Sequence, residues 1–193
     1  FEDVEWITVG DNQKDIDYFN LGITTLVTRL ANMNKNNNQG IVATLFALRG
    51  DNFKSSLLVP IVARFLNNDY EDNLKSIATV SLGELWFESG VPFLIESLDS
   101  GVPSRIQSEI VESLGKIGSE EAVVKLIQIV EENSNSLSAL RNDAVRALGD
   151  IRSDEAVPAI KKMAEESFDL DKKYYELGPG FVGIKALGKI GSP

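Results

Sequence analysis

A short sequence pattern recurs along this chain at intervals close to the length of one helical hairpin. A leucine followed by glycine stands at spacings of 32, 34 and 39 residues, as Leu82-Gly83, Leu114-Gly115, Leu148-Gly149 and Leu187-Gly188. A weaker, earlier copy places Leu45 at the leucine position. Such a period indicates a repeat architecture, because one amphipathic hairpin cannot bury its apolar faces without neighbours of the same kind.

Each copy divides into two amphipathic halves. In the first half, apolar residues recur at i, i+4 and i+7, as in Ile110, Leu114 and Ile117, which is the spacing of one helix face. A second apolar stripe follows. Proline recurs near the first turn of that second helix, where its missing N–H costs little, at Pro60, Pro92 and Pro158.

Glycine and serine mark the helix ends. Gly118 suits the left-handed residue just past a helix, and Ser119 and Ser153 suit the caps of the helices that follow. The glycine after the repeated leucine lies inside the first helix, where it costs about 1 kcal/mol relative to alanine. We expect this glycine to let the next helix approach closely.

These patterns predict an all-α fold, a right-handed α-solenoid (superhelix) of stacked helical hairpins. We expect residues 1–40 to form N-terminal capping helices. Residues 41–193 should form the repeat array, with about four repeats of which the last is incomplete, in one continuous domain. Ile184, Leu187 and Ile190 lack a following second helix that would cover them, so we expect the array to continue in a longer protein, unless a partner chain or the segment 169–180 covers this end.

The repeats resemble HEAT repeats of the short bacterial, phycobilisome-lyase-like type. The similarity is carried by "LGKIGSEEAV", "LGDIRSDEAVPAI" and "LGELWFESGVPFLIESL", spans about Ile41 to Pro193, and is strong from Ser76 onward. The resemblance implies a non-catalytic scaffold or adaptor that binds another protein, usually through a curved surface lined by the second helices. Its alternative implication is a bilin-lyase-like or other enzyme or chromophore-handling factor.

The amino-acid composition excludes several classes of function. The chain has no histidine and no cysteine, which excludes disulfides, Cys/His zinc sites and imidazole-based catalysis. With 19 Lys and Arg against 29 Asp and Glu, its formal net charge is −10, which disfavours binding to nucleic acid or to an anionic membrane surface. No apolar run is long enough to cross a bilayer. We predict no catalytic, metal-binding or cofactor-binding residues, no cofactor and no membrane insertion.

Charge is concentrated in the middle of the chain. Residues 61–132 contain 13 acidic and 5 basic side chains, which suits either a solubilising surface or a surface that steers a partner with a basic patch. On the second interpretation we predict partner-binding roles for Glu96, Asp99, Glu131 and Glu132. A second charged feature recurs two positions after the repeated leucine. We expect it to form a row of alternating charge along one edge of the repeat array, made of Glu84, Lys116, Asp150 and Lys189.

Aromatic residues supply the other candidate site. The segment 168–182 lengthens one repeat by about five residues and contains Tyr174, Tyr175 and Phe181, which either bind a partner or fill the groove between repeats. For Trp86 we expect a role in filling the core. The composition fits a soluble protein, cytoplasmic or, if a leader preceded Phe1, periplasmic or extracellular; it specifies neither the compartment nor the oligomeric state.

Overall fold

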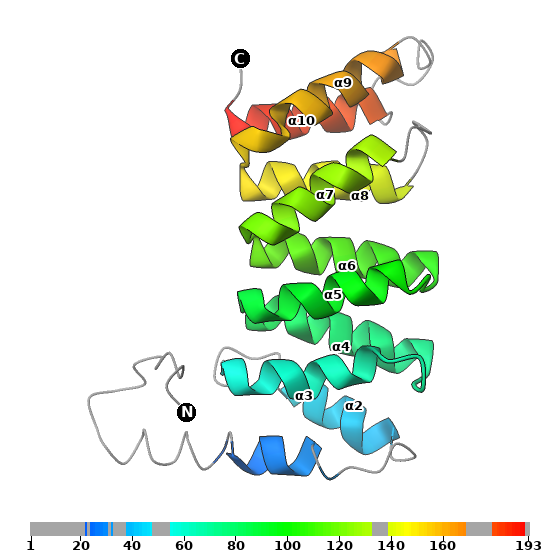
Figure 1. The fold of residues 1–193 in the computed structure, drawn as a ribbon, viewed down its shortest axis with the longest axis vertical. Coiled ribbons are helices and arrows are strands. Elements are labelled where there is room, and N and C mark those ends of the chain that lie inside the picture. The colour runs from blue at the N-terminus through cyan, green and yellow to red at the C-terminus, as the bar shows by residue number, and fades with distance from the viewer. Residues whose placement is uncertain are drawn as a thin grey trace, which may run out of the picture.

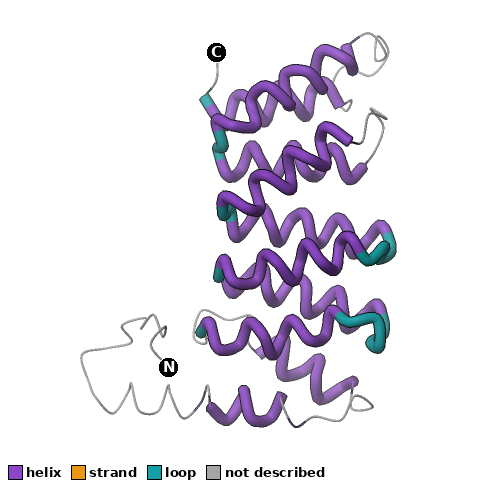
Figure 2. Tube along the Cα trace, viewed as in Figure 1, coloured by secondary structure: helices purple, strands orange, loops and turns teal. Residues whose placement is uncertain are grey.

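The computed structural model describes residues 22, 24–30, 32, 38–47, 55–132, 139–168 and 179–191, and within these ranges the chain forms helices and turns without any β-strand (Figure 2). Helical residues between 22 and 32 precede α2 (Asn38–Ala47). The all-α prediction is therefore confirmed for the part of the chain that the structure describes.

The helices alternate between two layers of one elongated stack (Figure 1). The layer of first helices contains α2, α4 (Asp72–Leu85), α6 (Ser104–Ile117), α8 (Ala139–Ile151) and α10 (Pro179–Ile190). The layer of second helices contains α3 (Val59–Ala63), α5 (Val91–Asp99), α7 (Glu120–Glu132) and α9 (Val157–Phe168). Consecutive helices pack on one another along the chain, so the stacked-hairpin prediction is confirmed. The right-handed sense of the superhelix stays a prediction.

Three of the second helices begin in a tight 3₁₀ turn. These turns are η2 (Ser56–Leu58) before α3, η4 (Glu88–Gly90) before α5 and η5 (Asp154–Ala156) before α9. A further turn, η3 (Arg64–Leu66), extends α3. The three recurrent prolines occupy the second residue of α3, α5 and α9, the first-turn position that the sequence predicted.

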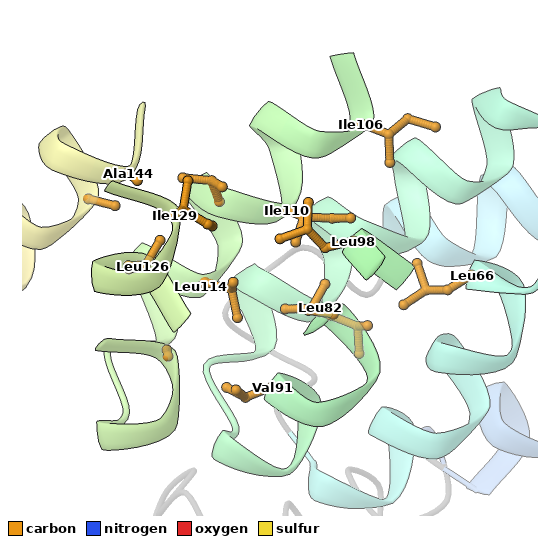
Figure 3. Close-up of a cluster of buried hydrophobic side chains, with 14 of the residues drawn as sticks. Leu66, Leu82, Val91, Leu98, Ile106, Ile110, Leu114, Leu126, Ile129 and Ala144 are labelled. Atoms are coloured by element: carbon orange, nitrogen blue, oxygen red, sulfur yellow. The ribbon is translucent and has the colours of Figure 1, made fainter. Parts of the chain in front are cut away.

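The core runs without interruption along the stack, between the two layers. Figure 3 shows Ile110 and Leu114 of α6 pointing into it beside Leu82 and Leu98 from the preceding repeat. Ile110, Leu114 and Leu148 are fully buried, so the predicted first-helix stripe does face the core. Each repeat thus buries its apolar face only against its neighbours, as a solenoid requires.

The recurrent glycines lie where successive first helices touch. A Cβ atom added to Gly83 would lie 2.6 Å from Ser113 Oγ, and one added to Gly115 would lie 2.8 Å from Ala147 Cβ. One added to Gly149 would lie 2.8 Å from the Cα atom of Ala186. Real Cβ contacts are essentially never so short, so the expected role of these glycines in close helix approach is confirmed. We call these three contacts the glycine ladder.

The capping residues predicted at the helix ends are found in one repeat and only partly in another. Gly118 has φ 65° and its N–H donates to the carbonyl of Leu114 at 2.9 Å. The Ser119 hydroxyl accepts a hydrogen bond from the N–H of Ala122 at 3.2 Å. Ser153 does stand at the N-cap of the turn η5, as predicted, but its side chain makes no capping hydrogen bond. There the chain enters α9 through η5, and the backbone carbonyl of Ser153 accepts the N–H of Ala156 instead.

A buried arginine joins three helices in the last repeats. Arg141 of α8 is 2% exposed. Its Nε donates to the carbonyl of Val130 in α7 at 2.8 Å, and its Nη2 lies 3.0 Å from Glu166 Oε2 in α9. The guanidinium of α8 therefore satisfies a backbone carbonyl near the end of α7 and also pairs with a carboxylate of α9. The forked arrangement of its N–H donors allows both contacts at once.

Candidate protein-interaction surface

The second helices expose one apolar side chain at the same position of each repeat. Val124 of α7 is 59% exposed, and the prolines that align with it are exposed as well, at Pro60, Pro92 and Pro158. Phe93, next to Pro92 on α5, is 37% exposed. We call Pro60, Pro92, Val124 and Pro158 the apolar column. Its four members come from the successive second helices α3, α5, α7 and α9, which follow one another along the long axis of the stack (Figure 1).

The predicted acidic residues lie on the same layer. Glu96 and Asp99 belong to α5, Glu131 and Glu132 belong to α7, and all four are exposed. The Asp99 Oδ1 atom lies 2.8 Å from the Nζ of Lys125, so an ion pair joins α5 to α7. The structure therefore brings all four candidate carboxylates onto two neighbouring second helices.

A surface cavity of about 420 Å³ lies where α3 and η3 approach α5. Pro60 lines one part of it and Phe93 and Glu96 line another, so the apolar column and an acidic candidate residue meet there. The remaining walls come from Ala63, Arg64, Leu66, Asn67, Asn68, Ser97 and Ser100. The cavity can receive a side chain with an apolar stem and a polar or charged end.

The layer of first helices differs in its charge. Its carboxylates pair with basic residues of the same layer. Glu112 Oε1 lies 3.0 Å from Lys116 Nζ, and Asp143 Oδ1 lies 2.7 Å from Arg146 Nη1. Asp150 pairs with Lys189 of the next first helix. In the predicted row of alternating charge, the Asp150–Lys189 pair thus forms between repeats, whereas the ion pair of Lys116 lies within its own helix. By contrast, α5 carries Glu96 and Asp99 without a basic residue, and α7 carries four glutamates and one lysine.

The aromatic candidates fall elsewhere. Tyr174 and Tyr175 lie outside the described residues. Phe181 was expected in an inserted segment, but α10 begins at Pro179, so Phe181 stands on a helix. Its ring is 39% exposed, and the Nζ atom of Lys185 lies 5.8 Å from the ring centroid. Helix α10 packs on α8 and α9, whereas the acidic candidates stand on α5 and α7, so the structure does not group Phe181 with them.

The prediction that Trp86 fills the core is wrong. Its side chain is 59% exposed, and its backbone is left-handed with φ 61°. Trp86 occupies the position of Gly118 in the next repeat, just past the end of a first helix, where the chain reverses at the surface. The alignment with Gly118 was the signal that could have placed it outside.

Neither a metal centre nor a transmembrane helix is found in the ranges that the structure describes. No group of three or more Asp and Glu side chains there is arranged to hold a metal ion. None of the helices in those ranges is long and apolar enough to cross a bilayer.

Two layers of antiparallel helices, stacked hairpin upon hairpin around one continuous core, define an all-α helical-repeat protein. Within it, residues 140–166, which form most of α8 and α9, match the family described as the PBS lyase HEAT-like repeat. The resemblance to HEAT repeats seen in the sequence is thus confirmed over that hairpin. No curated protein sequence matches the chain significantly.

Proposed function

We propose that this chain is a non-catalytic scaffold that binds a basic segment of another protein on the exposed face of its second helices. The observation that carries the proposal is the coincidence of the apolar column with unbalanced carboxylates on α5 and α7. Apolar side chains supply contact area, and the surrounding charge selects and steers the partner.

The apolar column supports a protein partner because its members are exposed in every repeat. A proline in the first helical turn has a structural reason of its own. Val124 has no such reason: a β-branched residue gains nothing in helix propensity from that position, yet 59% of it faces solvent. Phe93 adds an exposed aromatic ring beside the column, and aromatic residues are enriched where protein interfaces form.

The charge distribution supports a basic partner. Opposing charges raise the association rate and fix the orientation of the encounter, and ions screen them over about 10 Å at 0.1 M salt. We expect binding to weaken as salt is added. Charges in the layer of first helices are already paired with each other, so neutralising them should matter much less.

A pair of double variants tests this. Glu96→Gln with Glu131→Gln removes two carboxylates from the second helices, while Glu112→Gln with Asp150→Asn removes two from the first helices. Both change the net charge equally. Proteins captured from native lysate by the wild type and by each variant are compared by quantitative mass spectrometry. A partner lost with the first variant and kept with the second, and eluted by moderate salt, supports the proposal.

Equal capture by both variants would refute the acidic surface as the binding site, and so would binding that is insensitive to salt. The alternative, a chromophore-handling function, rests on the description of the family that matches residues 140–166. Mixing the protein with an open-chain tetrapyrrole tests that alternative directly. On the scaffold proposal, the visible absorption spectrum of the tetrapyrrole does not change.

A further inference from the structure

One core position of the second helices carries a polar residue in a single repeat. The second helices align on a recurrent valine, at Val59, Val91, Val123 and Val157. Six residues later, three repeats bury a large apolar side chain, Phe65, Ile129 or Met163. In α5 the same position is Ser97, which is buried as well, at 5% exposure. This serine gives up the apolar packing that the other repeats gain there.

The hydroxyl of Ser97 is buried and has no hydrogen-bond partner among the residues that the structure describes. Other buried helical serines donate to the carbonyl four residues earlier, as Ser167 does to Met163. Ser97 lines the cavity of about 420 Å³ between α3, η3 and α5, which we call the α3–α5 cavity. Because a buried polar group without a partner is unfavourable, a donor bound in this cavity would supply the missing hydrogen bond.

The same cavity has an unpaired carboxylate. Glu96 lines it, and no basic side chain in the described part of the chain forms an ion pair with Glu96, whereas Asp99 of the same helix pairs with Lys125. The C-terminal ends of η3 and α5 also meet there, since their capping residues Asn67 and Ser100 both line the cavity. Helix C-termini carry partial negative charge and favour cations, so the cavity suits a positively charged group.

The one basic residue of the cavity wall, Arg64, directs its charge elsewhere. Its Nη2 donates to the backbone carbonyl of Leu30, and its guanidinium carbon lies 4.7 Å from the centroid of the Phe65 ring. Leu30 belongs to the helical segment that precedes α2, which lies on the opposite side of α3 from α5 (Figure 1). Arg64 therefore leaves the carboxylate of Glu96 available to a ligand.

The spacing of the wall residues on α5 favours arginine over lysine. Phe93, Glu96 and Ser97 stand at i, i+3 and i+4, so they share one helix face. The ring of Phe93 is 37% exposed. A guanidinium is planar, stacks on an aromatic ring and donates through several N–H groups at once, whereas the lysine ammonium is a compact, strongly hydrated point charge. One guanidinium can therefore use the ring, the carboxylate and the hydroxyl together.

We propose that the α3–α5 cavity anchors the partner by receiving one arginine side chain, which stacks on Phe93, pairs with Glu96 and donates to the hydroxyl of Ser97. The inference rests on the proposed function in taking the occupant from a basic protein segment, and it adds the residue that is recognised and the repeat that recognises it. The next second helix lacks two of the three contacts, because Lys125 and Ile129 replace the aromatic ring and the hydroxyl.

Binding of short peptides to the full chain tests the inference without knowledge of the partner. The probes are blocked pentapeptides, acetyl-Gly-Ala-Xaa-Ala-Gly-amide, in which Xaa is arginine, lysine or citrulline, the neutral analogue of arginine. Nitrogen–proton correlation NMR gives the affinity and the location of binding in one titration. We expect the arginine peptide to shift the amide signals of Phe93, Glu96, Ser97 and Ser100. The lysine peptide should bind about fivefold more weakly, and the citrulline peptide about tenfold or more.

Three variants separate recognition from folding. Ser97→Ala should weaken the arginine peptide by roughly fivefold to tenfold. It should leave the urea unfolding midpoint unchanged or raise it, since the hydroxyl has no partner in the described part of the free protein. Glu96→Gln should weaken binding by about tenfold. The matched control Glu131→Gln removes the same charge outside the cavity and should change the affinity by less than about twofold.

Several results would overturn the anchor. They are equal affinity for the three peptides, equal losses in the two glutamate variants, signal changes away from the cavity, and no binding at millimolar peptide. A Ser97→Ala variant that unfolds at lower urea and still binds would make the serine purely structural. The lysate comparison above fails independently: peptide binding in the cavity with capture that ignores the acidic surface would refute only the proposed function. Capture that needs that surface, without arginine selectivity, would refute only the anchor.

Discussion

The glycine ladder leads to a prediction in which one substitution has opposite effects at two equivalent positions. Gly149 and Gly188 are both the third residue from the end of a first helix. Replacing glycine by alanine in a helix interior gains about 1 kcal/mol in intrinsic propensity. At Gly188 an added Cβ meets no atom within 4 Å, so Gly188→Ala should stabilise the protein by about 0.5–1 kcal/mol.

At Gly149 the same gain is opposed by a collision. The new Cβ would lie 2.8 Å from the Cα and 2.9 Å from the Cβ of Ala186, whereas carbon atoms make favourable contact at about 3.5–4.0 Å. Because one of the atoms met is backbone, α8 and α10 have to move apart. Inserting a methyl group into a well-packed interface costs about 1–3 kcal/mol, so Gly149→Ala should be neutral or destabilising, by up to about 2 kcal/mol.

The two variants together isolate the packing cost. Since the propensity gain is common to both, the difference between their free energies of unfolding should be about 1–3 kcal/mol. Urea denaturation followed by circular dichroism measures it, with similar slopes required for the comparison. If Gly149→Ala is stabilised as much as Gly188→Ala, successive first helices are not in close contact and the ladder argument fails.

Three further predictions concern the core, a cap and the buried arginine. Leu114→Ala and Leu148→Ala should each destabilise by about 2–5 kcal/mol; a loss in chemical denaturation below about 0.5 kcal/mol would place them at the surface. Ser119→Ala should cost about 1 kcal/mol in the same assay, whereas Ser153→Ala should cost almost nothing; equal losses would contradict the cap assignment. Arg141→Ala should cost about 1–3 kcal/mol by leaving a buried carbonyl unsatisfied, and an unchanged unfolding midpoint would show that this carbonyl has another donor.

The periodic features of the fold were readable from the sequence. Burial between stacked hairpins imposes the same demands on every repeat, so residues such as Leu114 and Leu148 return at the same position and are fully buried. The ladder glycines were predictable for the same reason. A glycine that is unfavourable in a helix interior, and yet recurs, requires a close neighbour to explain it.

Features that depend on one repeat alone could not be predicted in this way. Ser119 and Ser153 occupy equivalent positions, yet only the hydroxyl of Ser119 accepts a capping hydrogen bond. Arg141 is buried and pairs with Glu166, which lies 25 residues away on another helix. No local pattern connects those two residues.

The candidate surface was predicted only in part, for a geometrical reason. Counting charge along residues 61–132 mixes first and second helices, which face opposite sides of the array (Figure 1). Glu112 and Glu131 contribute equally to that count. Glu112 lies on a first helix and pairs with Lys116 of the same helix. Glu131 is exposed near the end of the second helix α7.

The division between the two layers gives a physical reason for placing partner binding on the second helices. Successive first helices contact each other closely through glycine and small residues, and successive second helices contact each other less. A side chain added at a ladder glycine such as Gly149 would collide with the next first helix, whereas a substitution at Val124 changes only a residue that is 59% exposed. The second helices can therefore vary their surface without disturbing the stack, and a binding surface requires that freedom.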